Sequence, residues 1–309
     1  MKLKSIFILI FVVCMIFAVS CSGEAPADAQ PDENEQEPSM ETDPPGPQPS
    51  PDPESVDNTE LTDTVNPEDT PEDTQGTSED TPEETPGITL PTGQESNGII
   101  IAIDPGHQRR GNYTQERIGE GSSQTKPMVS SGTTGAATKI PEYELTLEIS
   151  LQLRDELVSR GYEVFMIRET HDVDISNRTR AEMAAESGAS IFIRIHANGS
   201  TDSSAHGILT ISPTSKTPFI PTLYSRCRAL SQCILDEMIE TTGAKNRGIW
   251  ETDTMTGINW STIPVTIVEL GFMTNPDEDR RMQTPEYQQK LVEGMANGID
   301  FFFIFEFGD

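Results

Sequence analysis

The segment GIIIAID (98–104) is a compact apolar run, and the turn Pro105-Gly106 follows it directly. A compact run of apolar, mostly β-branched residues bounded by a turn is typical of a buried strand. Two later segments have the same character, SIFIRIH (190–196) and PVTIVEL (264–270). The sequence therefore predicts a buried sheet built from at least three such strands.

Amphipathic helices separate these strands. Residues 142–159 carry four apolar residues at helical spacing, between Pro141 at the first turn and Gly161 just past the end. The four are Leu145, Ile149, Leu153 and Leu157. Further helices are predicted at 176–187, 221–242 and 285–303, and further strands at 162–168 and 206–212. This alternation predicts a single three-layer α/β domain over 98–309, with a mostly parallel twisted sheet flanked by helices.

The first 21 residues have the layout of a signal peptide. Lys2 and Lys4 precede an apolar run of about 15 residues, which is shorter than the roughly 20 residues of a membrane-spanning helix. Small residues before Cys21 resemble the lipobox of bacterial lipoproteins, and this resemblance implies acylation of Cys21 after cleavage. An ordinary secretory signal and an uncleaved anchor are the alternatives.

Residues 22–97 are predicted to be a disordered linker. This segment holds 22 of the 51 acidic residues of the chain and no Lys or Arg, with proline throughout. Such a composition cannot bury enough apolar surface to fold, and charge repulsion keeps it extended. It is interpreted as a spacer that carries the following domain away from the membrane, the alternative being a solubilising tail without a specific role.

Charge and cysteine content exclude several classes of function. The predicted domain has 29 acidic against 19 basic residues, which argues against nucleic-acid binding. Cys227 and Cys233 lie six residues apart on a predicted helix and cannot bridge each other there. A disulfide framework and a cysteine zinc site are therefore not expected.

Three polar residues lie where the predicted strands end. His107 follows the first strand by the Pro-Gly turn, His196 closes its strand, and Glu269 lies near the end of another. In open α/β sheets, catalytic and ligand-binding residues lie at the carboxyl ends of the strands. Imidazoles with a carboxylate and an open position for water form the usual catalytic zinc shell. The alternative is that each is an ordinary polar loop residue.

Four ordered motifs resemble those of the zinc-dependent N-acetylmuramoyl-L-alanine amidases. The motifs are IDPGH (103–107), PEYELTLEI (141–149), IHAN (195–198) and VELGFMTN (268–275). The resemblance, which spans roughly 98–306, implies a phosphorylase/hydrolase-like fold and a Zn²⁺ held by His107, Glu142 and His196. It also implies that Glu269 is the catalytic base.

The metal glutamate has competitors nearby. Glu144 and Glu148 also lie in the second motif, but the family pattern, with apolar residues three and five positions after the ligand, favours Glu142. A first-turn acid favoured by the helix dipole is the alternative for Glu142.

Four residues outside the metal set have predicted roles. His206 is a possible substrate-binding residue, although a surface histidine is the alternative. His171 is expected to be solvated, Arg180 to form a structural salt bridge, and Asn275 to cap a turn. The chain also departs from the family pattern: Gln108-Arg109 replace a glycine pair, the loop 108–140 is long, and Arg194 stands where serine is commoner.

The predicted function is zinc-dependent hydrolysis of the amide bond between N-acetylmuramic acid and L-alanine in peptidoglycan. The expected location is extracytoplasmic, with attachment to the cell membrane through lipidated Cys21 and an activator protein as a possible partner. The alternatives are a zinc peptidase acting on another wall peptide bond and an inactive wall-binding or scaffold lipoprotein. A solute-binding lipoprotein would leave the histidine and glutamate pattern unexplained.

Overall fold

A computed structural model describes residues 87–90 and 95–307. The predicted signal peptide, Cys21 and most of the predicted linker lie outside the described residues. Among the helices that are described, none combines the length and apolar character needed to cross a membrane.

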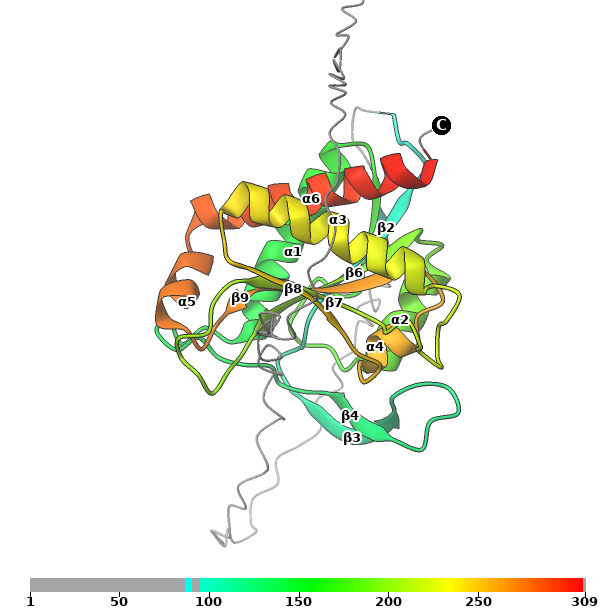
Figure 1. Cartoon of the computed structure of the whole chain (residues 1–309), viewed down its shortest axis with the longest axis horizontal. Helices are drawn as coiled ribbons and strands as arrows, with labels where there is room; N and C mark the ends of the chain where they lie inside the picture. Colours follow the sequence, from blue (N-terminus) through cyan, green and yellow to red (C-terminus); the bar gives the residue numbers. More distant parts are fainter. Residues whose placement is uncertain (1–86, 91–94, 308–309) are drawn as a thin grey trace, which may run out of the picture. The chain divides into compact units, whose positions relative to one another are not determined.

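A seven-stranded sheet forms the centre of the fold, in the order β1-β5-β2-β6-β9-β7-β8 (Figure 1). Its strands are β1 (Ile88–Thr89), β2 (Ile100–Pro105), β5 (Glu163–Met166), β6 (Ile191–Asn198), β7 (Ile208–Ser212), β8 (Asn246–Glu251) and β9 (Val265–Phe272). β5, β2, β6 and β9 are parallel to one another. β1 is antiparallel to β5, and β7 is antiparallel to β9.

The sheet is therefore mixed, which corrects the prediction of a mostly parallel sheet. The predicted core strands are parallel as expected, but β7 runs against β9 and β8 runs with β7. All five residues of β7 are buried. A strand buried on both faces has the same apolar pattern in either direction, so its sequence did not reveal the reversal.

Helices cover both faces of the sheet and make the predicted three layers (Figure 1). The helices are α1 (Glu142–Ser159), α2 (Asn177–Glu186), α3 (Tyr224–Thr242), α4 (Thr256–Asn259), α5 (Pro276–Met282) and α6 (Pro285–Phe307). One apolar core joins α1, α3 and α6 to one face of the sheet. A second core joins α2 and α4 to the other face.

The apolar stripe predicted for α1 is confirmed. Leu145, Ile149, Leu153 and Leu157 are fully buried in the first core. Gly161 follows the helix with a φ of 93°, a left-handed conformation that glycine adopts without a steric penalty. This helix is thereby fixed with its first residue, Glu142, at the end of the sheet where β2 and β6 end.

The long loop 108–140 contains a two-stranded hairpin that the sequence did not reveal. Its strands are β3 (Asn112–Arg117) and β4 (Thr125–Val129), which pair antiparallel. The indole Nε1 of Trp260 donates a 2.8 Å hydrogen bond to the carbonyl of Arg117 and ties the hairpin to the region after α4. β1 also lies within the range predicted as linker, where it extends the sheet beside β5.

Candidate metal centre and active site

His107 takes its position from a tight turn at the end of β2. Its φ of 60° is left-handed, an uncommon conformation for a residue other than glycine. Gly106 allows the close approach, because a Cβ there would lie 2.6 Å from Cε1 of His196 and from the carbonyl oxygen of Ile195. Thus the Pro-Gly turn of the sequence motif brings the two histidine rings together.

Glu142 is the first residue of α1, and its side chain is held by backbone donors from two other segments. Its Oε2 accepts a 2.8 Å hydrogen bond from the amide of Thr133, and its Oε1 accepts a 2.9 Å bond from the amide of Ala197. The carboxylate is almost fully buried. A buried carboxylate held this rigidly is suited to be a ligand rather than a solvated first-turn acid.

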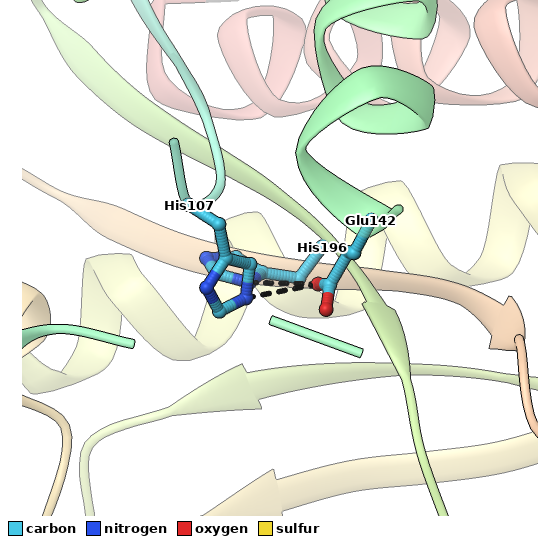
Figure 2. Close-up of side chains that lie close together, drawn as sticks. All are labelled: His107, Glu142 and His196. Carbon is cyan, nitrogen blue, oxygen red and sulfur yellow. Dashed lines mark hydrogen bonds and ion pairs between the residues drawn. The ribbon is translucent and has the colours of Figure 1, made fainter. Parts of the chain in front are cut away.

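His107, Glu142 and His196 converge on one point (Figure 2). Nε2 of His107 lies 3.1 Å from Oε1 of Glu142, and Nδ1 of His196 lies 3.3 Å from the same oxygen. The two ring nitrogens are 3.1 Å apart. Three parts of the chain far apart in sequence thus supply one candidate metal site.

The donor set fits a Zn²⁺ ion. Nitrogen and oxygen ligands at about 2.0–2.2 Å from a tetrahedral zinc lie roughly 3.3 Å from one another, close to the separations seen here. Nδ1 of His107 lies 2.9 Å from the carbonyl oxygen of Ser130. Donation by Nδ1–H to that carbonyl leaves Nε2 with a free lone pair, which is the usual way in which a metal-binding imidazole is oriented.

The electrostatics of the cluster favour a positive charge between these side chains. Burial raises the pKa of Glu142, but His107 and His196 outweigh burial and hold this pKa below its usual range. Burial lowers the pKa of His107, yet the Glu142 carboxylate shifts it upward overall. Burial lowers the pKa of His196 to about 4, so this imidazole is neutral near pH 7 and its lone pair can coordinate a metal.

Glu269 lies beside the cluster on the neighbouring strand. It is paired in register with His196 across β6 and β9, so both side chains project from the same face of the sheet. Its Oε2 is buried and has no hydrogen-bond partner among the described residues. Burial, and then the charge of Glu142, raise the pKa of Glu269 well above its usual value. A carboxyl group in this state is a candidate for proton transfer.

The four residues line one cavity of about 960 Å³. Lys126, Pro127 and Val129 of the β3–β4 hairpin form part of its wall, so the loop 108–140 shapes the entrance. Gly132 packs closely against two of the cluster side chains, since a Cβ at this position would be 2.9 Å from Oε2 of Glu142 and from Cδ2 of His107.

The remaining predicted residues fall outside the cluster. His206 is exposed, lies close to the carbonyl of Ser204 through Nδ1, and does not line the cavity. His171 is partly buried against Tyr143 rather than fully solvated. Asn275 caps α5 by accepting hydrogen bonds from the amides of Asp277 and Glu278, as predicted. Cys227 and Cys233 are both free thiols.

Arg180 forms the predicted salt bridge, within a buried network that the sequence did not reveal. Nη1 of Arg180 lies 2.6 Å from Oδ1 of Asp104, and Nε of Arg194 lies 2.8 Å from Oδ2 of the same carboxylate. Arg180 and Arg194 hold the pKa of Asp104 at about 2 despite the opposing effect of burial. The available signal was Asp104 in the apolar strand GIIIAID, where an unpaired charge would be costly.

Fold and site together define a class of protein: an α/β domain with a mixed sheet, whose cavity holds a His-Glu-His cluster and a neighbouring carboxylate. Residues 101–300 match the Amidase_3 family, N-acetylmuramoyl-L-alanine amidase. The chain belongs to this family of hydrolases, as the four motifs predict.

Known relatives agree with this membership. The germination-specific N-acetylmuramoyl-L-alanine amidase of Bacillus subtilis is 27% identical over 178 residues, which are 52% of this chain and 70% of that protein. N-acetylmuramoyl-L-alanine amidase LytC of the same organism is 25% identical over 64% of this chain but only 34% of its own length. The crystal structure of the amidase Ami1 from Mycobacterium smegmatis superposes with a TM-score of 0.60 at 24% identity, covering 68% of this chain and 98% of that one. This last likeness shows the shared fold.

Proposed function

We propose that the chain is a zinc-dependent amidase that hydrolyses the bond between N-acetylmuramic acid and L-alanine in peptidoglycan. The observation that carries the proposal is the convergence of His107, Glu142 and His196 within 3.1–3.3 Å, with Glu269 on the adjacent strand. Membership of the amidase family supplies the bond that is cleaved.

The three clustered side chains would hold the metal through Nε2 of His107, Oε1 of Glu142 and Nδ1 of His196. A bound Zn²⁺ would polarise the scissile carbonyl and lower the pKa of water to about 7. The backbone amides of Thr133 and Ala197 keep the Glu142 carboxylate oriented towards the two rings. Because all three side chains line the cavity, water or substrate would reach a metal held between them from that side.

Glu269 would act as general base and then as general acid. Its unpartnered Oε2 can accept a proton from the attacking water and return it to the nitrogen of the leaving L-alanine. Glu269→Gln keeps the shape of the side chain but cannot carry this proton. We expect the variant to retain zinc and to lose about 10²–10⁴-fold in turnover; normal turnover would refute the assigned role.

We further propose that the protein works outside the cytoplasm, attached to the membrane through acylated Cys21. The signal-like residues 1–21 and the acidic, proline-rich stretch that follows support this location. Mass spectrometry of the mature amino terminus in the producing cell tests the anchor. A diacylglyceryl adduct on Cys21 is expected, whereas cleavage elsewhere without lipid would contradict it.

Product analysis separates this function from its alternatives. The purified chain is incubated with intact peptidoglycan and with the Glu269→Gln variant as control. An amidase releases stem peptides with a free L-alanine amino terminus and leaves the glycan unshortened. Cleavage within the stem peptide would indicate the zinc peptidase, and wall binding without any cleavage would indicate the scaffold lipoprotein.

A further inference from the structure

We propose that Arg194 forms a carboxylate-binding subsite in the cavity and makes the enzyme select stem peptides with a free carboxylate on their second residue. This inference rests on the proposed amidase function for the identity of the substrate. The site itself rests on the surroundings of the Arg194 side chain.

Arg194 lies on the same face of the sheet as the candidate metal centre. It precedes His196 by two residues on β6, so both side chains project into the same layer, with Cα atoms roughly 6.6 Å apart. Both residues line the cavity. A ligand bound at the metal centre therefore extends past Arg194 if it continues along β6 towards the start of that strand.

The guanidinium group of Arg194 is held rigidly but not fully satisfied. Its Nε donates to Asp104, and its Nη2 donates a 2.7 Å hydrogen bond to Oδ1 of Asn177. The residue is only 3% exposed. Its third nitrogen, Nη1, makes no hydrogen bond within the described residues and lies against Gly257, another residue that lines the cavity. Nη1 is thus a fixed donor that lacks an acceptor.

The local charge also favours an anion. Asp104 is shared between Arg194 and Arg180, so two guanidinium groups face one carboxylate. Glu116 also interacts electrostatically with Arg194 and with Arg178, and Arg178 is itself paired with Glu182. Asn177 is the first residue of α2, where the helix dipole attracts negative charge, and it also lines the cavity.

The remaining floor of the subsite is apolar. Arg194 pairs in register with Ile267, Ile267 with Ile211, and Ile211 with Trp250, so the four form a row across the sheet. All four residues line the cavity. The row parallels the one that contains His196 and Glu269. It offers a charged end and an aliphatic–aromatic surface to a ligand with a carboxylate and an aliphatic portion.

The chemistry of the proposed substrate places the carboxylate on its peptide side. The lactyl carboxyl of N-acetylmuramic acid is consumed in the scissile amide, and the glycan has no other acid. One extended residue spans about 3.3–3.6 Å, so the second peptide residue lies about 7 Å from the scissile carbonyl. This distance matches the spacing of about 6.6 Å between the row of His196 and the row of Arg194. We therefore assign the α-carboxylate of the second peptide residue to Nη1 of Arg194.

The test compares two ligands that differ only in this group. L-Ala-D-Glu has a free α-carboxylate, and L-Ala-D-isoglutamine has a carboxamide in its place. Their dissociation constants for the zinc-loaded protein are measured by calorimetry. The corresponding muramoyl dipeptides are compared by kcat/KM. A charge-assisted hydrogen bond predicts at least a tenfold preference for the carboxylate in both assays, expressed in KM rather than kcat because the contact is remote from the reacting bond.

Two variants and one control make the outcome specific. Arg194→Lys retains a charge beside Asp104 but loses Nη1. Asn177→Asp still accepts from Arg194 and places a negative charge in the subsite. Both are expected to reduce the preference to about twofold or less. Arg154→Lys makes the same substitution at an ion pair outside the cavity and should keep the wild-type preference.

Equal affinity of the wild-type protein for the two dipeptides would overturn the inference. It would also be overturned if both variants, folded as judged by their unfolding temperatures, kept the wild-type preference. If the protein cleaves neither muramoyl dipeptide but still discriminates between the free dipeptides through Arg194, the proposed function fails while the subsite stands.

Discussion

Replacing Asp104 by Asn tests whether the buried network beneath the site stabilises the fold. Asp104 is completely buried and accepts from Arg180 at 2.6 Å and from Arg194 at 2.8 Å. The amide keeps the size of the side chain but removes the charge, which leaves two buried guanidinium groups without a counter-ion. Removing one partner of a buried ion pair costs about 3–5 kcal/mol.

The pKa of Asp104 gives a second estimate of the same effect. The pKa falls from 3.8 to about 2, because the arginines outweigh burial. At 1.36 kcal/mol per unit this shift corresponds to about 2 kcal/mol. Since the folded-state pKa is the lower one, this stability is fully present above about pH 4 and is lost as the pH falls towards 2. Both estimates place the contribution at about 2–5 kcal/mol near neutral pH.

Urea denaturation followed by circular dichroism measures the change. With a slope of about 2–3 kcal/mol per molar, the midpoint of Asp104→Asn should fall by about 1–2 M at pH 7. Asp277→Asn is the matched control, because Asp277 pairs with Arg280 at the surface and is 96% exposed. The control should shift by less than about 1 kcal/mol. Equal, small shifts for both variants would refute the reasoning.

Three further results are expected. Gly132→Ala should weaken zinc binding about tenfold or more, because the new Cβ meets Glu142 and His107. Gly121→Ala introduces the same left-handed φ strain in open space and should leave the zinc affinity unchanged. Competition with a chromogenic chelator measures both affinities, and equal losses would contradict the steric explanation. Leu153→Ala should lower the free energy of unfolding by about 2–5 kcal/mol in a urea titration, because Leu153 is fully buried in the core. A chelator should lower the unfolding temperature of the wild-type protein in calorimetry but not that of His196→Ala; a similar drop in both would place the stabilising metal elsewhere.

The sequence predicted most of the elements that position the site. Runs such as SIFIRIH and PVTIVEL are short, apolar and rich in β-branched residues, which favours strands, and the spacing of Leu and Ile over 142–159 favours a helix. His107, His196 and Glu269 end up at one edge because strand ends of a parallel sheet meet there. Glu142 needed the family resemblance, since Glu144 and Glu148 are chemically equivalent.

Other features depend on contacts that the sequence does not encode locally. The β3–β4 hairpin is polar and mostly exposed, and a tertiary hydrogen bond from Trp260 fixes it in place. Strand β8 contains Gly248 and lies at the edge of the sheet, so it lacks a buried alternating pattern. The pairing of Asp104 with Arg194 follows from the register of β2 and β6, which only the fold provides.

Zinc stoichiometry of three purified proteins tests the candidate metal centre most directly. The wild-type chain and His206→Ala should each bind about one zinc per chain, because His206 is exposed and lies outside the cavity. His196→Ala should bind almost none after dialysis against trace chelator, because it removes one of the three converging ligands. Full zinc occupancy in His196→Ala, or no zinc in the wild-type chain, would contradict the assignment of His107, Glu142 and His196 as a metal site.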